Sequence, residues 1–156
     1  MATASSPSED VARIVEVGAK EVTEREAVAE CTITMTREAV AQLVAGTPKG
    51  DPLEAARIAG IMAVKRTPDL LPFCHPIAVT GAEVVVEPAL QDGRIRVQAT
   101  VRARDRTGVE MEALTASAIA ALSLYDTAKA YDRGAVISGL RLLSKRGGKS
   151  GEYRAT

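Results

Sequence analysis

Strict alternation of apolar and polar residues is clearest at positions 94–104, RIRVQATVRAR. A period of two residues is typical of a strand with one face in the core. The dipeptide Asp92-Gly93 just before it predicts a hairpin turn, which would connect this strand to another at 77–88. The side chains assigned to the core face are Ile95, Val97, Ala99, Val101 and Ala103.

Helical signals occur in three other segments. Residues 36–46 favour a short helix that ends at a glycine. Residues 51–66 favour a second helix, because Asp51 can cap it, a proline follows at the first helical position, and cations precede the next proline. A long third helix is predicted from about 109 to 132.

Stretches rich in β-branched residues at 30–35 and 135–145 predict the first and last strands. The element order is then strand, helix, strand, strand, helix, strand. This order predicts an α+β, ferredoxin-like βαββαβ fold, in which helices cover one face of an antiparallel sheet. The other face would be solvated or covered by another subunit. Residues 1–10 are predicted to be a disordered tail from their composition, and residues 11–156 to form a single domain.

Composition narrows the classes of function. The chain of 156 residues has 20 basic and 20 acidic side chains and a sequence pI of about 6.6. Proteins that bind nucleic acids or membrane surfaces usually carry a basic excess, so neither partner is predicted. Two cysteines and one histidine fit neither a disulfide framework nor a closed zinc site, and no metal site is expected. The sequence shows no signal peptide or membrane span, which favours a cytoplasmic protein.

Two charged residues near the end of the long helix, Asp126 and Lys129, fall on or beside its predicted core stripe. They are three positions apart, so their side chains can meet. One interpretation is a helix-end ion pair, and the other is a partly buried acid/base pair that transfers protons. The stripe consists of Met111, Leu114, Ala118, Leu122 and Tyr125.

Other polar groups allow both a structural and a functional interpretation. His75, the only histidine, follows Cys74 in an apolar loop, where it could contact a substrate or simply form a rigid corner. Glu110 and Glu112 could favour the dipole of the long helix or bind the edge of a purine-like ring, although positions two apart do not share a helix face. The basic, glycine-rich tail at 144–151 could be a mobile, solvated segment or a strap over phosphates.

Five motifs occur in order between about residues 12 and 152: PKGDPLEAARIAGIMAVKRT, LPFCHPIAVTG, DRTGVEMEAL, LYDTAKAYDRG and KRGGKSG. Together they resemble the cyclic pyranopterin monophosphate synthase family, molybdenum cofactor biosynthesis protein C. The resemblance implies a ferredoxin-like subunit in a homohexamer, a trimer of dimers with active sites at the dimer interfaces. It also implies a lyase that converts 3′,8-cyclo-7,8-dihydro-GTP, made by a radical S-adenosylmethionine GTP cyclase, to cyclic pyranopterin monophosphate and diphosphate.

The same resemblance assigns roles to individual residues. It implies that Asp126 is catalytic, with Lys129 and Lys49 as its acid/base partners. No cofactor is implied, and although Mg²⁺ could accompany the phosphates, nothing in the sequence requires it. The residues that resemblance places at the substrate are Phe73, Cys74, His75, Met111 and Glu112, with Lys65, Arg25, Glu110 and Lys145 as further contacts.

Some positions depart from the family pattern. Glu16 stands where the family has an aspartate, no histidine precedes it, and Phe73 replaces a commoner aliphatic residue. Thr127-Ala128 replaces Met-Cys between the proposed catalytic residues without changing either of them. The alternatives to an enzyme are a non-catalytic nucleotide- or phosphate-binding module of the same fold and a purely structural subunit.

Overall fold

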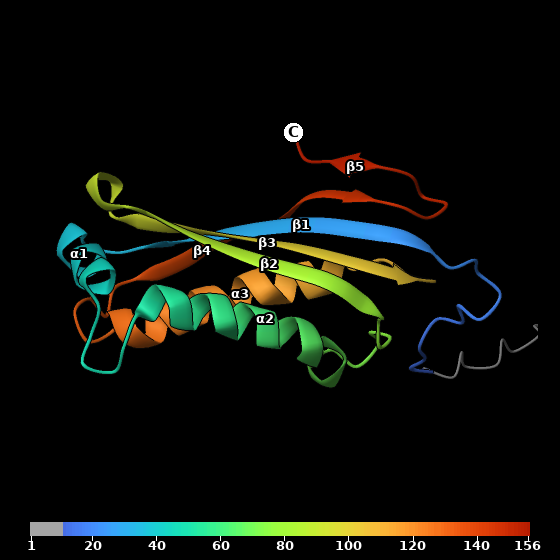
Figure 1. Ribbon diagram of the computed structural model, residues 1–156, viewed down its shortest axis with the longest axis horizontal. Coiled ribbons are helices and arrows are strands. Elements are labelled where there is room, and N and C mark those ends of the chain that lie inside the picture. Colours follow the sequence, from blue (N-terminus) through green and yellow to red (C-terminus); the bar gives the residue numbers. More distant parts are fainter. Residues whose placement is uncertain (1–10) are drawn as a thin grey trace, which may run out of the picture.

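The computed structural model describes residues 11–156, so the disorder predicted for residues 1–10 lies outside the described part. A five-stranded sheet has the order β2-β3-β1-β4-β5, and all of its strand pairs are antiparallel (Figure 1). The strands are β1 (Thr23–Thr34), β2 (Val79–Ala89), β3 (Arg94–Asp105), β4 (Val136–Arg146) and β5 (Tyr153–Arg154).

Helices α2 (Pro52–Leu70) and α3 (Glu110–Ala128) lie side by side under one face of the sheet, and the short helix α1 (Arg37–Ala45) lies at one end (Figure 1). Apart from the extra helix in the first crossover, β1 to β4 and the two long helices follow the βαββαβ order with β1 and β3 central. The predicted α+β, ferredoxin-like fold is therefore confirmed. A one-turn 3₁₀ helix (Leu90–Asp92) and left-handed Gly93 form the predicted hairpin connection.

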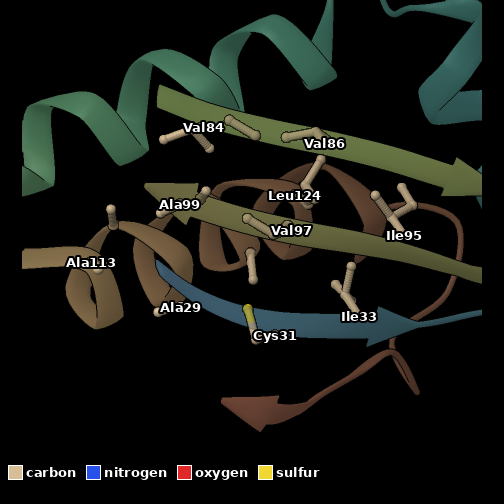
Figure 2. Packing of buried hydrophobic residues seen from close by; sticks show 14 of the residues in the cluster. Ala29, Cys31, Ile33, Val84, Val86, Ile95, Val97, Ala99, Ala113 and Leu124 are labelled. Carbon is tan, nitrogen blue, oxygen red and sulfur yellow. The ribbon is translucent and has the colours of Figure 1, made fainter. Parts of the chain in front are cut away.

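The core lies between the sheet and the helices. The five alternating apolar residues of β3 are all buried, as predicted, and Leu124 of α3 points toward them (Figure 2). β1 was predicted only from residue 30, but it begins at Thr23. The sequence did not predict its first half, because glutamates alternate there with small apolar residues. No neighbouring residue in the sequence indicated which cations would pair with those glutamates.

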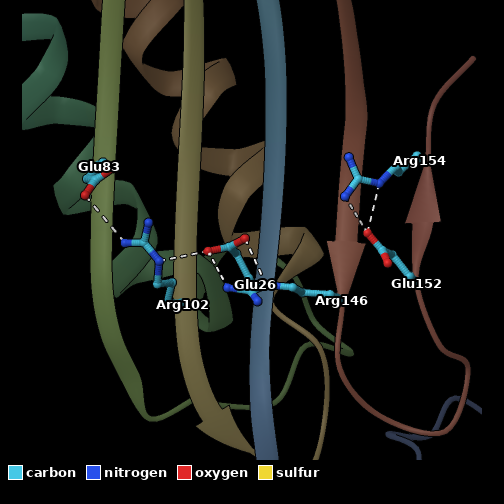
Figure 3. A network of polar contacts seen from close by, with 6 residues as sticks. All are labelled: Glu26, Glu83, Arg102, Arg146, Glu152 and Arg154. Carbon is cyan, nitrogen blue, oxygen red and sulfur yellow. Dashed lines mark hydrogen bonds and ion pairs between the residues drawn. The ribbon is translucent and has the colours of Figure 1, made fainter.

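Those glutamates find partners on the open face of the sheet. Figure 3 shows a row from Glu83 through Arg102 and Glu26 to Arg146, with ion-pair distances of 3.5, 2.8 and 3.1 Å. Hydrogen bonds from Arg146 and Arg102 hold the pKa of Glu26 below its usual value. A second row of the same kind comprises Glu87, Arg96, Glu30 and Arg141.

The predicted core stripe of α3 is only partly correct, because Leu114 and Tyr125 are partly buried and pack against the core, whereas two other members of the stripe are exposed. Met111 and Leu122 are 42% and 53% exposed, and the helix buries mainly small residues instead. Close packing explains this choice, because a Cβ added to Gly60 of α2 would lie 3.1 Å from the Ala116 carbonyl oxygen. Large side chains cannot fit between helices at that separation. The buried residues of α3 are Glu112, Ala113, Ala116, Ser117, Ala120, Ala121, Leu124 and Ala128.

Two predicted helix ends are also wrong by about one turn. Helix α2 continues through Pro68 to Leu70, and the buried Thr67 hydroxyl donates to the Ala63 carbonyl at 2.8 Å. Helix α3 ends at Ala128 rather than 132, because the next residues form a tight turn whose amides still point back to the Ala128 carbonyl. The first residues of the basic segment 144–151 belong to β4, and beyond that segment Tyr153 and Arg154 pair with β4 as β5.

Candidate functional site

The Cys-His-Pro corner lies beside the N-terminal end of α3. The Cys74 amide donates to the Leu71 carbonyl at 3.2 Å, which closes the turn between α2 and the segment that leads into β2. A hollow of about 320 Å³ opens there. Its lining residues are Phe73, Cys74, His75, Ile77, Thr107, Gly108, Glu110 and Met111. The fold therefore gathers five of the residues that resemblance assigned to the substrate.

Glu112 lies behind this hollow rather than on its wall. Its side chain is only 1% exposed, its Oε2 atom has no hydrogen-bond partner among the described residues, and the Cys74 thiol donates to Oε1 at 3.6 Å. Burial raises the pKa of Glu112. Burial and the neighbouring Glu112 also raise the pKa of Cys74 to about 11. As the helix geometry predicted, Glu110 and Glu112 face different directions.

A second, larger cavity of about 610 Å³ adjoins the first and shares Thr107, Gly108 and Glu110 with it. Lys145 of β4 contributes to its wall and contacts the Glu110 carboxylate at 3.1 Å and the Ser150 hydroxyl at 2.9 Å. The cavity is lined by Lys20, Glu21, Thr23, Arg25, Arg106, Thr107, Gly108, Glu110, Lys145, Gly148, Lys149 and Ser150. Of these, Arg25, Glu110 and Lys145 were among the predicted site residues, whereas the cations Lys20 and Arg106 were not. Their only signal in the sequence is their position beside β1 and beside the TGVEMEAL segment.

Asp126, Lys129 and Lys49 come together at the opposite end of α3. The Lys129 Nζ atom lies 2.7 Å from Asp126 Oδ1, and the side chains are 57% and 76% exposed, respectively. The hydrogen bond and charge of Lys129, with a smaller contribution from Lys49, lower the pKa of Asp126. The ion pair is therefore present, but the expected partial burial is wrong within one subunit because both side chains are largely exposed.

The predicted residues thus form two clusters within one subunit. At a rise of about 1.5 Å per residue, the sixteen positions between Glu110 and Asp126 separate the two ends of α3 by about 24 Å. Lys65, on the exposed surface of α2, lines neither cavity. Neither of the two cavities is lined by Asp126 or Lys129.

Comparison with known proteins identifies the family. A model described as the MoaC family matches residues 14–148. The chain belongs to the MoaC family. A cyclic pyranopterin monophosphate synthase of Parvibaculum lavamentivorans is 52% identical over 146 residues, which cover 92% of this chain and 91% of that protein. A protein of the same name from Streptomyces griseus is 52% identical, and the match covers 93% of this chain and 81% of that protein. Another, from Pelotomaculum thermopropionicum, is 50% identical, and the match covers 91% of this chain and 84% of that protein.

The predicted resemblance to the MoaC family is therefore confirmed over most of the chain. Within residues 11–156, no three histidine, cysteine or acidic side chains gather as metal ligands. In the same residues no helix combines the length and apolar character needed to cross a membrane.

The contact between Cys74 and Glu112 in this MoaC-family chain has a measurable consequence. A thiol with a pKa of about 11 instead of 9.0 has about a hundredfold smaller thiolate fraction near pH 8. We expect Cys74 to react correspondingly slowly with iodoacetamide. Glu112→Gln should increase its rate severalfold, because a neutral amide removes the nearby negative charge. Peptide mapping by mass spectrometry would follow Cys74 alone, and equal rates in both proteins would contradict this coupling.

Proposed function

We propose that this chain converts 3′,8-cyclo-7,8-dihydro-GTP to cyclic pyranopterin monophosphate and diphosphate, as a lyase of molybdenum cofactor biosynthesis. The observation that carries this function is the relationship itself, since proteins about 50% identical over nine-tenths of the chain are named cyclic pyranopterin monophosphate synthase. A binding module that retained only the fold is not favoured. A substrate with a ring system and a triphosphate also suits the two adjoining cavities, because one is partly apolar and the other is basic.

The side chains supply the groups that this chemistry requires. Rearrangement of the ring system needs protons to be moved between several atoms, and Asp126 with Lys129 forms an acid/base pair for that task. Closure of the cyclic phosphate forms a bond between a substrate oxygen and the α-phosphorus. The bond from that phosphorus to the diphosphate oxygen breaks. Lys49 carries a positive charge close enough to Asp126 to lower its pKa, which places a third group at the same end of α3.

The separation of the two clusters favours a site built from two subunits. One small molecule cannot contact both ends of the same α3 helix, about 24 Å apart. Both ends also leave functional side chains exposed, including Phe73 at 57% and Asp126 at 76%. A dimer that joins the acid/base end of one subunit to the Cys-His-Pro end of its partner would complete the site. A two-subunit site requires at least a dimer, and the homohexamer that the family resemblance implies, a trimer of dimers, would contain such dimers.

Mixed oligomers test the shared site directly. Asp126→Asn and His75→Ala affect opposite ends of α3, so each homo-oligomer should be inactive. Random mixing of dissociated subunits should restore about a quarter of the wild-type sites, since half of the dimers are mixed and each has one intact site. Mixing either variant with itself is the matched control. Activity that remains at the level of the separate variants, although mass spectrometry shows mixed oligomers, would contradict the two-subunit site.

We place the enzyme in the cytoplasm, downstream of a radical S-adenosylmethionine cyclase that makes its substrate from GTP. The decisive experiment supplies 3′,8-cyclo-7,8-dihydro-GTP to the purified protein and measures released diphosphate together with the cyclic product. An Mg²⁺ titration in the same assay would establish whether the ion contributes. A folded hexamer that releases no diphosphate at any Mg²⁺ concentration would exclude the synthase function.

A further inference from the structure

The candidate catalytic residues come from two different segments of the chain. Asp126 and Lys129 belong to the C-terminal end of α3, whereas Lys49 belongs to the loop between α1 and α2. That loop is a tight turn, because the amides of Thr47 and Gly50 each donate to the carbonyl of the other, at 3.0 and 2.9 Å. The backbone of Lys49 is therefore fixed relative to the end of α1. The geometry of the acid/base residues then depends on what holds α1 against the end of α3.

One carboxylate joins these two segments. Asp132 follows α3, and its Oδ2 atom accepts a hydrogen bond at 2.9 Å from the amide of Thr36, the residue that caps the N-terminus of α1. Its Oδ1 atom accepts from the Gly134 amide at 2.8 Å, within the turn that follows α3. Helix α1 lies at the same end of the molecule as that turn (Figure 1). Both oxygens of Asp132 are thus used, one for each segment.

The turn that carries Asp132 is fixed to the last residues of α3. The Asp132 amide donates to the Ala128 carbonyl at 2.8 Å. The Lys129 amide donates to the Tyr125 carbonyl at 2.9 Å, and the Tyr125 hydroxyl donates to the Arg133 carbonyl at 3.2 Å. Asp132 therefore connects through hydrogen bonds to the end of α3 on one side and to α1 on the other.

We propose that Asp132 is a positioning residue of the synthase reaction, which holds α1 against the end of α3 and so sets where Lys49 lies relative to the acid/base pair. The inference rests on the proposed function and adds a residue to which the family resemblance gave no role. The ion pair of Asp126 and Lys129 is exposed, so packing within the subunit does not orient it. Misplacement of a catalytic group by about 1 Å can lower turnover about 10²-fold, so a residue that contacts no substrate can still control the rate.

A double-mutant cycle with Lys49 tests this role. Asp132→Ala removes both hydrogen bonds of the carboxylate, whereas Asp132→Asn keeps one, because the amide oxygen can accept but the NH₂ group cannot. The alanine variant should lower kcat for diphosphate release at least about tenfold, and the asparagine variant less, with little change in KM. In the Lys49→Met background, Asp132→Ala should lower kcat no more than about twofold, because the group that it positions is already absent.

A second measurement needs no turnover. The charge of Lys49 acts on Asp126 and lowers its pKa, so a carbodiimide cross-link between the two side chains reports their proximity. Peptide mapping of the intact oligomer by mass spectrometry gives the yield, which should fall severalfold in Asp132→Ala. Asp92→Ala is the matched control, because it removes a carboxylate from the hairpin turn that also contacts α1, but its ion pair is with Arg94. Its cross-link yield and kcat should equal those of the wild type.

The outcomes separate positioning from stability. Equal losses of kcat in the wild-type and Lys49→Met backgrounds would show that Asp132 acts only through stability, and would overturn the proposal. An unchanged kcat, or a cross-link that is absent from the wild type or independent of Asp132, would also overturn it. Thermal melts identify variants that lose the fold, and Asp132→Asn provides the test if Asp132→Ala does not fold. A cross-link that depends on Asp132, in a folded protein that does not convert the cyclic nucleotide, would uphold the positioning contact and reject the synthase reaction.

Discussion

Asp126→Asn is expected to lower kcat for diphosphate release at least about 10²-fold, and Lys129→Met should do the same, because positioned acid/base groups commonly contribute factors of 10² to 10⁴. Neither change should alter the melting temperature appreciably, since the ion pair is solvent-exposed within the subunit. Diphosphate and cyclic product would be measured under saturating substrate. A small effect on KM would indicate that the pair acts in the chemical steps rather than in uniform binding.

Helix α2 provides a matched control for these substitutions. Arg66 and Asp69 form an ion pair with the same spacing, at 3.6 Å, and both side chains are well exposed. Asp69→Asn therefore removes the same kind of contact outside the candidate site, and kcat should not change. Equal losses in Asp69→Asn and Asp126→Asn would show that the effect on turnover comes from helix stability rather than from chemistry.

The pH dependence should separate the roles of the two residues. Lys129 lowers the pKa of Asp126, so the carboxylate stays ionised to lower pH than it would alone. Lys129→Met removes the hydrogen bond and the charge, and Lys49 remains as the other cation that acts on Asp126. The residual activity should then fall at a higher pH on the acid side than in the wild type. An acid limb at the same pH in both proteins would mean that Asp126 does not control it.

Local patterns in the sequence were enough to predict much of the fold. The alternation of β3, the Asp-Gly turn and the Asp51 cap each depend on neighbouring residues, and all were placed correctly. Elements that depend on distant partners were missed. The first half of β1 requires arginines from two other strands to neutralise Glu26, and β5 exists only because two tail residues pair with Ser144 and Lys145.

The candidate site shows the same division. Sequence motifs assigned both His75 and Asp126 to the site. No linear pattern reveals that, within one subunit, these two residues lie near opposite ends of α3. Lys20 and Arg106 were missed because their proximity depends on how residues 11–22, which precede β1, lie against the loop before α3. The distribution of charge around a cavity depends on how distant segments of the chain fold together, so only the structure could reveal it.

Leu124→Ala should be the most destabilising of the substitutions considered, with a loss of about 2–5 kcal/mol in the free energy of unfolding. Leu124 is fully buried, and its side chain points from α3 toward the apolar face of β2 and β3 (Figure 2). The small residues around it on α3 cannot expand to fill the space. Alanine keeps a high helix propensity, so the loss would arise from the cavity and the missing contacts rather than from the helix itself.

Leu122→Ala makes the same chemical change two positions away and is the matched control. Leu122 is 53% exposed, so its truncation should cost no more than about 0.5 kcal/mol. Urea denaturation at one fixed protein concentration would compare both variants with the wild type, because subunit association contributes to the midpoint. The sequence pattern of large residues on α3 predicts the reverse order, with Leu122 in the core. A larger loss for Leu122→Ala would therefore reinstate that stripe, whereas a larger loss for Leu124→Ala supports a helix that packs through its small residues.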